Sequence, residues 1–243
     1  MNGPRSLLAA GCAAALAGCT TMATLDPKSD GALKAMSDQL AGADQLSVSA
    51  YRRLDRQLID NPNMIGNAAI EAQIDRPDRA KAVVRGSGEE RRLYLGKDGS
   101  TIHSRNSNFY AQFPGHPTIE KACDAASAKL GIHIPMQDFL SSNPYREFKS
   151  GSDTIEHAGV ERAGGQTCDH LMGSRDDLEW HLWISQSSRL PVRYTITAAG
   201  LKGKDHLQLD FKNWNLAPTI AAGTFDFTPP KGSREIEFLL PGE

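Results

Sequence analysis

Strict alternation of apolar and polar side chains in the last third of the chain is the feature that most constrains the fold. Between Asp205 and Lys212, the residues Leu207, Leu209 and Phe211 alternate with polar residues. Two further segments have the same period, with apolar phases formed by Trp180, Leu182 and Ile184 and by Tyr194, Ile196 and Ala198. Successive side chains of a strand point to opposite faces. The pattern therefore predicts strands with one apolar and one wet face, as is typical of antiparallel sheets.

Residues 46–113 repeat this pattern in short segments that are separated by turn residues. The predicted turns are Arg76-Pro77-Asp78, Gly86-Ser87-Gly88 and Lys97-Asp98-Gly99-Ser100. Strands joined by such short turns form antiparallel hairpins. Together with the last third of the chain, this gives about ten strands, and an open sheet of that size tends to curl.

Two longer segments have helical spacing. Asp26 can cap a helix that begins at Pro27 and carries an apolar stripe to about residue 45. A second helix is predicted from Thr118 to Leu130, and residues 135–148 contain short helical turns interrupted at Asn143-Pro144. A helix with one apolar stripe must lie on another element. The predicted fold class is therefore α+β: a strongly curved antiparallel sheet, or incomplete barrel, whose concave face is covered by helices.

The N-terminus has the features of a secretory leader. Arg5 precedes an apolar run from Leu7 to Ala17, which is too short to span a bilayer. The tetrapeptide Leu16-Ala17-Gly18-Cys19 is similar to the lipobox of bacterial lipoproteins, in which the cysteine is lipidated and becomes the new N-terminus. Within that resemblance, Thr20 after Cys19 implies an outer-membrane protein that faces the periplasm. The predicted organisation is a signal peptide (1–18), a tether (19–25) and a single domain (26–243).

An ordinary cleavage site is the alternative to lipidation. Ala15-Leu16-Ala17 also fits the small-residue pattern of such sites, and cleavage there would leave a soluble periplasmic protein. Cys12 lies in the leader and lacks the preceding Leu. Two cysteines then remain, Cys123 and Cys168, and an oxidising compartment favours a disulfide between them. The alternative is two separate buried thiols, because free cysteine packs as a small apolar residue.

Composition and motifs argue against several classes of function. The 243 residues include 27 Lys and Arg against 29 Asp and Glu, a formal charge of −2, so the basic excess of a nucleic-acid-binding protein is missing. The seven His form no His-x-x-x-His or His-Glu-x-x-His pair, and neither Gly-x-Ser-x-Gly nor Gly-x-Gly-x-x-Gly occurs in a suitable context. Asp169 and His170 are neighbours in a strand, so their side chains point to opposite faces. We expect no catalytic residues, no cofactor and no metal.

A series of short motifs resembles a known family. In chain order, the motifs are Arg76-Pro77-Asp78-Arg79, Arg92-Leu93-Tyr94 with Gly96-Lys97, Phe109-Tyr110-Ala111, Thr118-Ile119-Glu120, Gly131-Ile132-x-Ile134-Pro135, Cys168-Asp169-His170-Leu171, Trp180-His181-Leu182-Trp183-Ile184, Leu190-Pro191-x-Arg193, Asn213-Trp214-Asn215-Leu216-Ala217-Pro218 and Phe225-x-Phe227-x-Pro229-Pro230. Over residues 26–238 they resemble the domain-of-unknown-function family numbered twenty ninety-two, described as predicted periplasmic proteins. One departure is Tyr94-Leu95-Gly96-Lys97, where the family typically has Tyr-Asp-Gly-Lys.

The resemblance implies the fold of the outer-membrane lipoprotein carriers of the LolA/LolB type, an incomplete barrel with a helical lid over an apolar cavity. It implies no activity and no catalytic residues. We therefore expect a monomeric envelope lipoprotein that holds a lipid, or the palmitate-like acyl part of a lipoprotein, without chemistry. The predicted cavity-lining residues are Leu33, Met36, Leu40, Trp180, Leu182, Ile196, Leu207, Leu209 and Phe211.

Two alternatives remain. The first is a protein-interaction or stress-sensing scaffold of the same fold with a filled interior, and the second is an envelope hydrolase. Trp183 has the opposite phase to Trp180 in its segment. It either packs against neighbouring side chains or is exposed toward a membrane or a partner.

Overall fold

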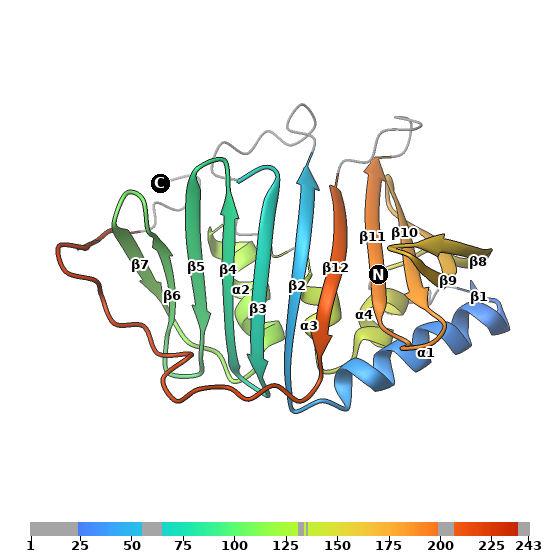
Figure 1. The fold of residues 1–243 in the computed structure, drawn as a ribbon, viewed down its shortest axis with the longest axis horizontal. Coiled ribbons are helices and arrows are strands. Elements are labelled where there is room, and N and C mark those ends of the chain that lie inside the picture. Colours follow the sequence, from blue (N-terminus) through green and yellow to red (C-terminus); the bar gives the residue numbers. More distant parts are fainter. Residues whose placement is uncertain (1–23, 55–64, 131–133, 135, 199–206, 238–243) are drawn as a thin grey trace, which may run out of the picture.

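The computed structural model describes residues 24–54, 65–130, 134, 136–198 and 207–237. Its main element is one sheet of thirteen strands in the order β1-β8-β9-β10-β11-β12-β2-β3-β4-β5-β6-β7-β13. The sheet is curved and unclosed, as the sequence predicted (Figure 1). The strands are β1 (Thr24–Leu25), β2 (Gln45–Leu54), β3 (Ala68–Asp75), β4 (Arg79–Gly86), β5 (Glu89–Leu95), β6 (Ser100–Ser104), β7 (Phe109–Phe113), β8 (Thr154–Ala163), β9 (Gln166–Arg175), β10 (Leu178–Ser185), β11 (Pro191–Ala198), β12 (Leu207–Asn215) and β13 (Arg234–Glu235).

The hairpins form where the turn residues predicted them. β3 and β4 are joined through residues 76–78, β4 and β5 through residues 87–88, and β5 and β6 through residues 96–99. These pairs are antiparallel, whereas the two-residue strands at the edges, β1 beside β8 and β13 beside β7, pair in parallel. At the β4–β5 turn, Ser87 and Gly88 both have positive φ, as a tight two-residue hairpin requires.

The four helices found in the described residues lie on one face of the sheet, which we call the helix face (Figure 1). They are α1 (Pro27–Ala41), α2 (Ile119–Leu130), α3 (Gln137–Leu140) and α4 (Pro144–Ser150). Helix α1 begins as predicted: the Asp26 carboxylate accepts hydrogen bonds from the backbone N–H groups of Lys28 and Ser29. It also accepts one from the N–H of His157 in β8, at 3.0 Å. The hydrogen bonds to this carboxylate, led by that of the Ser29 hydroxyl, lower the pKa of Asp26 to about 2.

The alternation that predicted the strands divides the sheet into its two faces. Along β2, Leu46, Val48 and Ala50 are buried on the helix face, while the residues between them are at least half-buried and polar. The register continues the apolar face across neighbouring strands, since Tyr194 pairs with Leu209 and Ile196 with Leu207. The opposite face, which we call the outer face, carries most of the charged side chains of the central strands.

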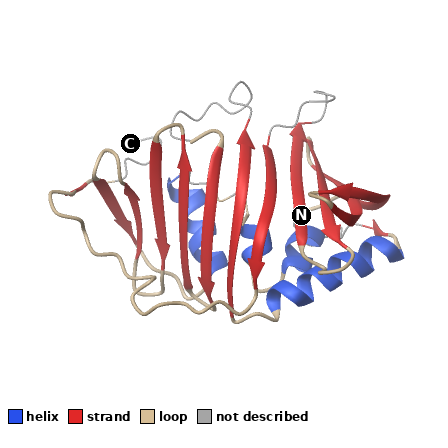
Figure 2. Ribbon diagram, in the orientation of Figure 1, coloured by secondary structure: helices blue, strands red, loops and turns tan. Residues whose placement is uncertain are grey.

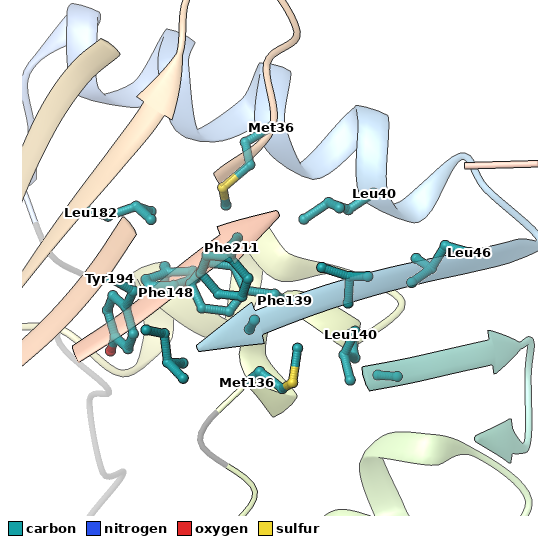
Figure 3. Close-up of a cluster of buried hydrophobic side chains, with 14 of the residues drawn as sticks. Met36, Leu40, Leu46, Met136, Phe139, Leu140, Phe148, Leu182, Tyr194 and Phe211 are labelled. Carbon is teal, nitrogen blue, oxygen red and sulfur yellow. The ribbon is translucent and has the colours of Figure 1, made fainter. Parts of the chain in front are cut away.

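The interior is densest where α1, α3 and α4 cover β2 and β9–β12. Phe139 of α3 lies at the centre, with ring centroids 5.2 Å from Phe148, 5.3 Å from Tyr194 and 4.9 Å from Phe211 (Figure 3). Phe148 in turn lies 5.3 Å from Trp180. Such edge-to-face contacts add to the free energy gained from burial of the rings.

The segment after β12 crosses to the far edge of the sheet. It runs along one end of the strands to β13, beside β7 (Figure 2). On the way, Phe227 packs on the outer face against Tyr94, His103 and Tyr110, with centroid distances of 5.5, 5.6 and 5.2 Å. This contact leaves His103 almost fully buried, and its Nε2 atom has no hydrogen-bond partner.

Arg76 joins three elements at the end of β3. Its guanidinium donates to the carbonyl oxygens of Leu40 (3.4 Å), Ala43 (3.2 Å) and Leu140 (2.7 Å). The carbonyls at a helix C-terminus have no partner within the helix. Arg76 therefore satisfies oxygen atoms at the ends of α1 and α3 and fixes both helices to the β3–β4 turn.

We predict that Arg76→Ala lowers the free energy of unfolding by about 2–4 kcal/mol, because it leaves buried carbonyl groups without a donor. The matched control is Arg79→Ala, on the other side of the same turn. Arg79 is largely exposed and pairs with Asp75, and an exposed ion pair is worth about 1 kcal/mol or less. Urea unfolding of both variants tests this prediction, and equal losses would contradict it.

A second prediction concerns pH. Burial lowers the pKa of His103 below its ordinary value, and the nearby Arg92 and Arg105 act in the same direction. Between pH 7 and pH 5 the unfolded chain therefore binds a proton at this residue that the folded chain does not. The free energy of unfolding should fall over this range, and His103→Gln should remove part of the fall. The matched control is His116→Gln, which replaces a half-buried histidine outside this contact. A His103→Gln curve parallel to the wild-type curve would refute the assignment.

Candidate ligand-binding surface

The predicted cavity-lining residues come together, but they form a packed core. Eight of the nine are buried in the main hydrophobic cluster, and Ile196 is partly buried against it. Figure 3 shows four of the eight, Met36, Leu40, Leu182 and Phe211. The eight are Leu33, Met36, Leu40, Trp180, Leu182, Leu207, Leu209 and Phe211. Five of them, Leu33, Met36, Leu40, Leu182 and Leu209, have no accessible surface. A side chain with zero accessible area has no water-sized space beside it, so these five line no cavity.

The physical reason for this close packing lies in residues 136–148. The sequence predicted short helical turns there, but not the position of their aromatic rings. Phe139 of α3 and Phe148 of α4 occupy the space between α1 and the sheet, and both are fully buried. The part of the helix face over β2 and β9–β12 is therefore closed, and we call it the closed core.

The other part of the helix face, over β4–β7, is only half covered. Ala80, Leu95 and Ala111 on this part are buried, but six other apolar side chains with the same phase retain partial exposure: Ala82, Val84, Leu93, Ile102, Phe109 and Phe113. We call this set the open face. Figure 1 shows α2 behind the middle strands and no described helix behind β6 and β7. Half-exposed apolar side chains that adjoin one another mark a surface suited to an apolar ligand.

A small cavity lies between α2 and the sheet, next to the open face. Its volume is about 20 Å³, enough for about one water molecule. The sheet contributes Ala72, Ile74, Leu93 and Leu95, and α2 contributes Ile119 and Cys123. The buried positions of α2 also include the small residues Ala122 and Ala126. We call this cavity the α2 slot, and it is nearly closed in this conformation.

The first turn of α2 is held at its N-terminal end. The N–H of Ile119 donates to the carbonyl of Pro77 at 3.0 Å. The Glu120 carboxylate accepts a hydrogen bond from the N–H of Ser142 after α3, and this bond helps to keep the pKa of Glu120 below its usual value although burial opposes the shift. The start of α2 is thus fixed to both the β3–β4 turn and the segment after α3.

The two remaining cysteines are free and buried, in separate clusters. Cys123 belongs to the main cluster, whereas Cys168 lies with Ala163, Val192 and Trp183 in a small second cluster. Burial raises the pKa of the Cys123 thiol to about 12. Of the two sequence-based alternatives, the structure has separate buried thiols and not a disulfide. Cys12 and Cys19 lie outside the described residues.

A second, polar groove of about 1040 Å³ adjoins the α2 slot across Leu95. It lies at the ends of β4–β7. Its walls come from three segments that contain family-like motifs: the β3–β4 turn with Arg79, the segment Tyr94 to Lys97, and the C-terminal segment with Phe225. The Arg79 guanidinium lies 5.3 Å from the ring of Phe225. Sequence reasoning did not identify this groove, because its walls come from turns that are distant in the chain.

The structure separates Asp169 and His170, the neighbouring polar residues of β9 that could have formed a catalytic pair. Asp169 and His170 lie on opposite faces, as predicted: Asp169 contacts His157 at 3.3 Å, and His170 contacts His181 at 2.8 Å. Within the described ranges, no group of three or more His, Cys, Asp or Glu side chains is arranged to hold a metal ion. None of the helices described is both long and apolar enough to cross a membrane.

Comparison with solved structures shows a shared fold at low sequence identity. An uncharacterised conserved protein from Thermus thermophilus aligns with a TM-score of 0.54 and 11% identity, covering 86% of this chain and 99% of that one. The lipoprotein LppX of Mycobacterium tuberculosis aligns with a TM-score of 0.48 and 16% identity over 81% and 100% of the two chains. A LolA superfamily protein from Nitrosomonas europaea gives 0.36 and 10% over 79% and 94%.

No curated protein matches the sequence. A sequence family described as "Predicted periplasmic protein (DUF2092)" matches residues 29–239, which is most of the chain. The chain therefore belongs to this family of predicted periplasmic proteins.

Proposed function

We propose that the protein binds a hydrophobic ligand, a lipid or the acyl chain of a lipoprotein, on the open face and beneath α2, without catalysis. The observation that carries this proposal is the uneven cover of the helix face. The apolar phase that is sealed over β2 and β9–β12 keeps six partly exposed side chains over β4–β7. The sheet thus presents an apolar surface that its own helices do not fill.

An acyl chain would gain affinity from burial alone. Each methylene removed from water contributes about 0.8 kcal/mol. Leu93 pairs with Ile102, and Ile102 pairs with Ala111, which lies two residues before Phe113 on the same face, so these side chains form an apolar path across β5, β6 and β7. A few methylenes along this path would give useful affinity before the α2 slot opens at all.

The α2 slot would extend the site if α2 moved away from the sheet. Its first turn is bonded to Pro77, so displacement of its later turns is the expected movement. After Ile119, the buried residues described in α2 are small (Ala122, Cys123 and Ala126), and the separation of small side chains exposes little apolar area. The polar groove beyond Leu95 has room for the head of an amphiphile.

We predict that Ile102→Glu weakens binding of a fluorescent long-chain fatty acid at least tenfold, because it places a carboxylate in the middle of the open face. The residue is half-exposed, so the folded state should tolerate the change. Val160→Glu is the matched control, since Val160 lies on β8 with 56% of its surface exposed. Fluorescence titration measures both affinities. Equal affinity of the two variants, or no binding by the wild type, would rule out the open face as the site.

We further propose that Cys19 is lipidated and that the protein is anchored in the outer membrane, facing the periplasm. The lipobox-like residues before Cys19 support this proposal. Thr24 and Leu25 pair with Thr154 and Ile155 of β8, so an anchor at Cys19 would lie only a few residues from that edge of the sheet.

The anchor has its own test. Cys19→Ala should abolish incorporation of labelled palmitate and move the protein from the membrane fraction to the soluble periplasmic fraction. Cys12→Ala should change neither result. Continued labelling of Cys19→Ala would mean that the acceptor lies elsewhere, and a wild-type protein found only in the soluble fraction would favour ordinary cleavage of the leader.

A protein-interaction or stress-sensing scaffold is the second candidate function. The closed core favours it, because the residues expected to line a cavity are packed as in an ordinary interior. Mass spectrometry of lipids that co-purify with the native protein separates the two functions. A lipid-free protein that also fails to bind fatty acid would support the scaffold.

A further inference from the structure

The open face ends in a row of side chains that includes two arginines. In this row, Arg91 of β5 pairs with Ser104 of β6, and Ser104 pairs with Phe109 of β7. Phe109 in turn pairs with Arg234 of β13. Because Arg91 lies two residues before Leu93 of the open face, its side chain points to the same face. We call Arg91, Ser104 and Arg234 the basic rim, and it lies at the upper end of the strands in Figure 1.

Arg234 places its positive charge directly over an open-face side chain. Its guanidinium lies 4.8 Å from the centre of the Phe109 ring, which is half-buried. Within the described residues Arg234 forms no ion pair, and the neighbouring Glu235 lies on the outer face, where it accepts a hydrogen bond from the Tyr110 hydroxyl at 3.4 Å. The charge of Arg234 is therefore available to an anion that lies at this end of the open face.

Arg91 can bind the same anion without losing its present partner. It pairs with Glu89 at 3.2 Å, and 30% of the Arg91 side chain and 50% of the Glu89 side chain are exposed. Such an exposed ion pair contributes little to stability. A guanidinium carries five N–H donors, so it can contact two acidic groups at once.

A third arginine adds to the positive charge at this end of the helix face. Arg52 of β2 is only 5% exposed, and its guanidinium donates to the carbonyl oxygens of Ile65 and Gly66. It forms no ion pair with any residue that the structure describes. Burial lowers the pKa of Arg52 below its ordinary value, and the charge of Arg91 acts in the same direction. An anion bound beside Arg91 would reduce the repulsion between these two guanidinium groups.

The polar groove at the opposite end of the strands has balanced charges. Arg79 pairs with Asp75, and the Lys97 ammonium lies 3.3 Å from Asp98. The backbone N–H of Lys97 also donates to the Asp78 carboxylate at 3.3 Å. An anionic head would have to compete with these carboxylates, so it gains more from the basic rim than from the polar groove.

We propose that the ligand of the open face is an anionic amphiphile whose carboxylate or phosphate head is bound between Arg91 and Arg234. This inference rests on the proposed lipid site and adds the charge of the ligand and the direction in which it lies. Three strand spacings separate β5 from β13, about 14 Å in all, so the two long side chains approach one head from opposite sides. The Ser104 hydroxyl between them accepts a hydrogen bond from Ser107 at 2.8 Å and has its own hydrogen left to donate to the head.

Two probes of equal chain length separate the contribution of the head from that of the acyl chain. They are dodecanoic acid with a pyrene label at its methyl end, which is ionised at pH 8, and the methyl ester of the same acid. Fluorescence titration of the full chain at low salt measures both affinities. The double variant Arg91→Gln/Arg234→Gln should bind the acid about tenfold more weakly, because each exposed ion pair is worth up to about fivefold. Its affinity for the uncharged ester should stay within twofold of the wild type.

The matched control is Arg53→Gln, which removes an arginine that is 51% exposed and pairs with Asp210. Its affinities for both probes should equal those of the wild type. If the double variant fails to fold, Arg234→Gln replaces it, since Arg234 is exposed at the edge of the sheet. That single variant should lose about threefold to fivefold in affinity for the acid alone.

The contrary results separate this inference from the lipid site itself. If the wild type binds both probes and the variants keep full affinity for the acid, the basic rim does not bind the head, although the lipid site stands. Equal losses for acid and ester would mean that the arginines support this edge of the sheet and not a head. A selective loss for the acid in Lys97→Gln alone would place the head in the polar groove. If the wild type binds neither probe, the lipid site and this inference both fail.

Discussion

The structure depends on one constraint: a sheet of thirteen strands has a long apolar face, and the described helices are too few to cover it. Two of the four helices, α3 and α4, have only four and seven residues. Apolar area left in water costs free energy in proportion to its size. Helices α1, α3 and α4 cover the apolar face over β2 and β9–β12, whereas the face over β4–β7 stays partly exposed. The closed core and the open face both arise because the described helices cover only part of the sheet.

The closed core is stabilised by aromatic rings that fill the space under α1 and by an arginine that bonds the helices to the sheet. Phe139 contacts three other aromatic rings, so the two shortest helices contribute more to the interior than their length suggests. Arg76 then connects the ends of α1 and α3 to the turn that also receives the first turn of α2. The closed core and the start of α2 therefore share one anchor, and the buried side chains described in the later turns of α2 are the small residues Ala122, Cys123 and Ala126.

Much of the fold could be predicted from the sequence, and the candidate site only in part. The period of two identified the faces of β10, β11 and β12, because a strand alternates whatever lies against it. The Asp26-Pro27 start of α1 was predictable for the same reason: capping is a local interaction. What fills the space opposite a strand is not local. Leu33 and Leu209 were recognised as facing inward, but only the positions of Phe139 and Phe148 decide that they meet other side chains and not a cavity.

The outer face shows the same limit of sequence-based prediction: the face on which a side chain lies is predictable, but the residue that it contacts is not. His170 and His181 are eleven residues apart, in strands whose register places them diagonally, since His170 pairs with Trp183 and His181 with Met172. The distance between the two histidines in the sequence does not predict this contact. The alternation of polar and apolar residues in each strand does predict that both side chains lie on the outer face. Trp180 and His181 are adjacent in β10 and point into the closed core and onto the outer face, respectively.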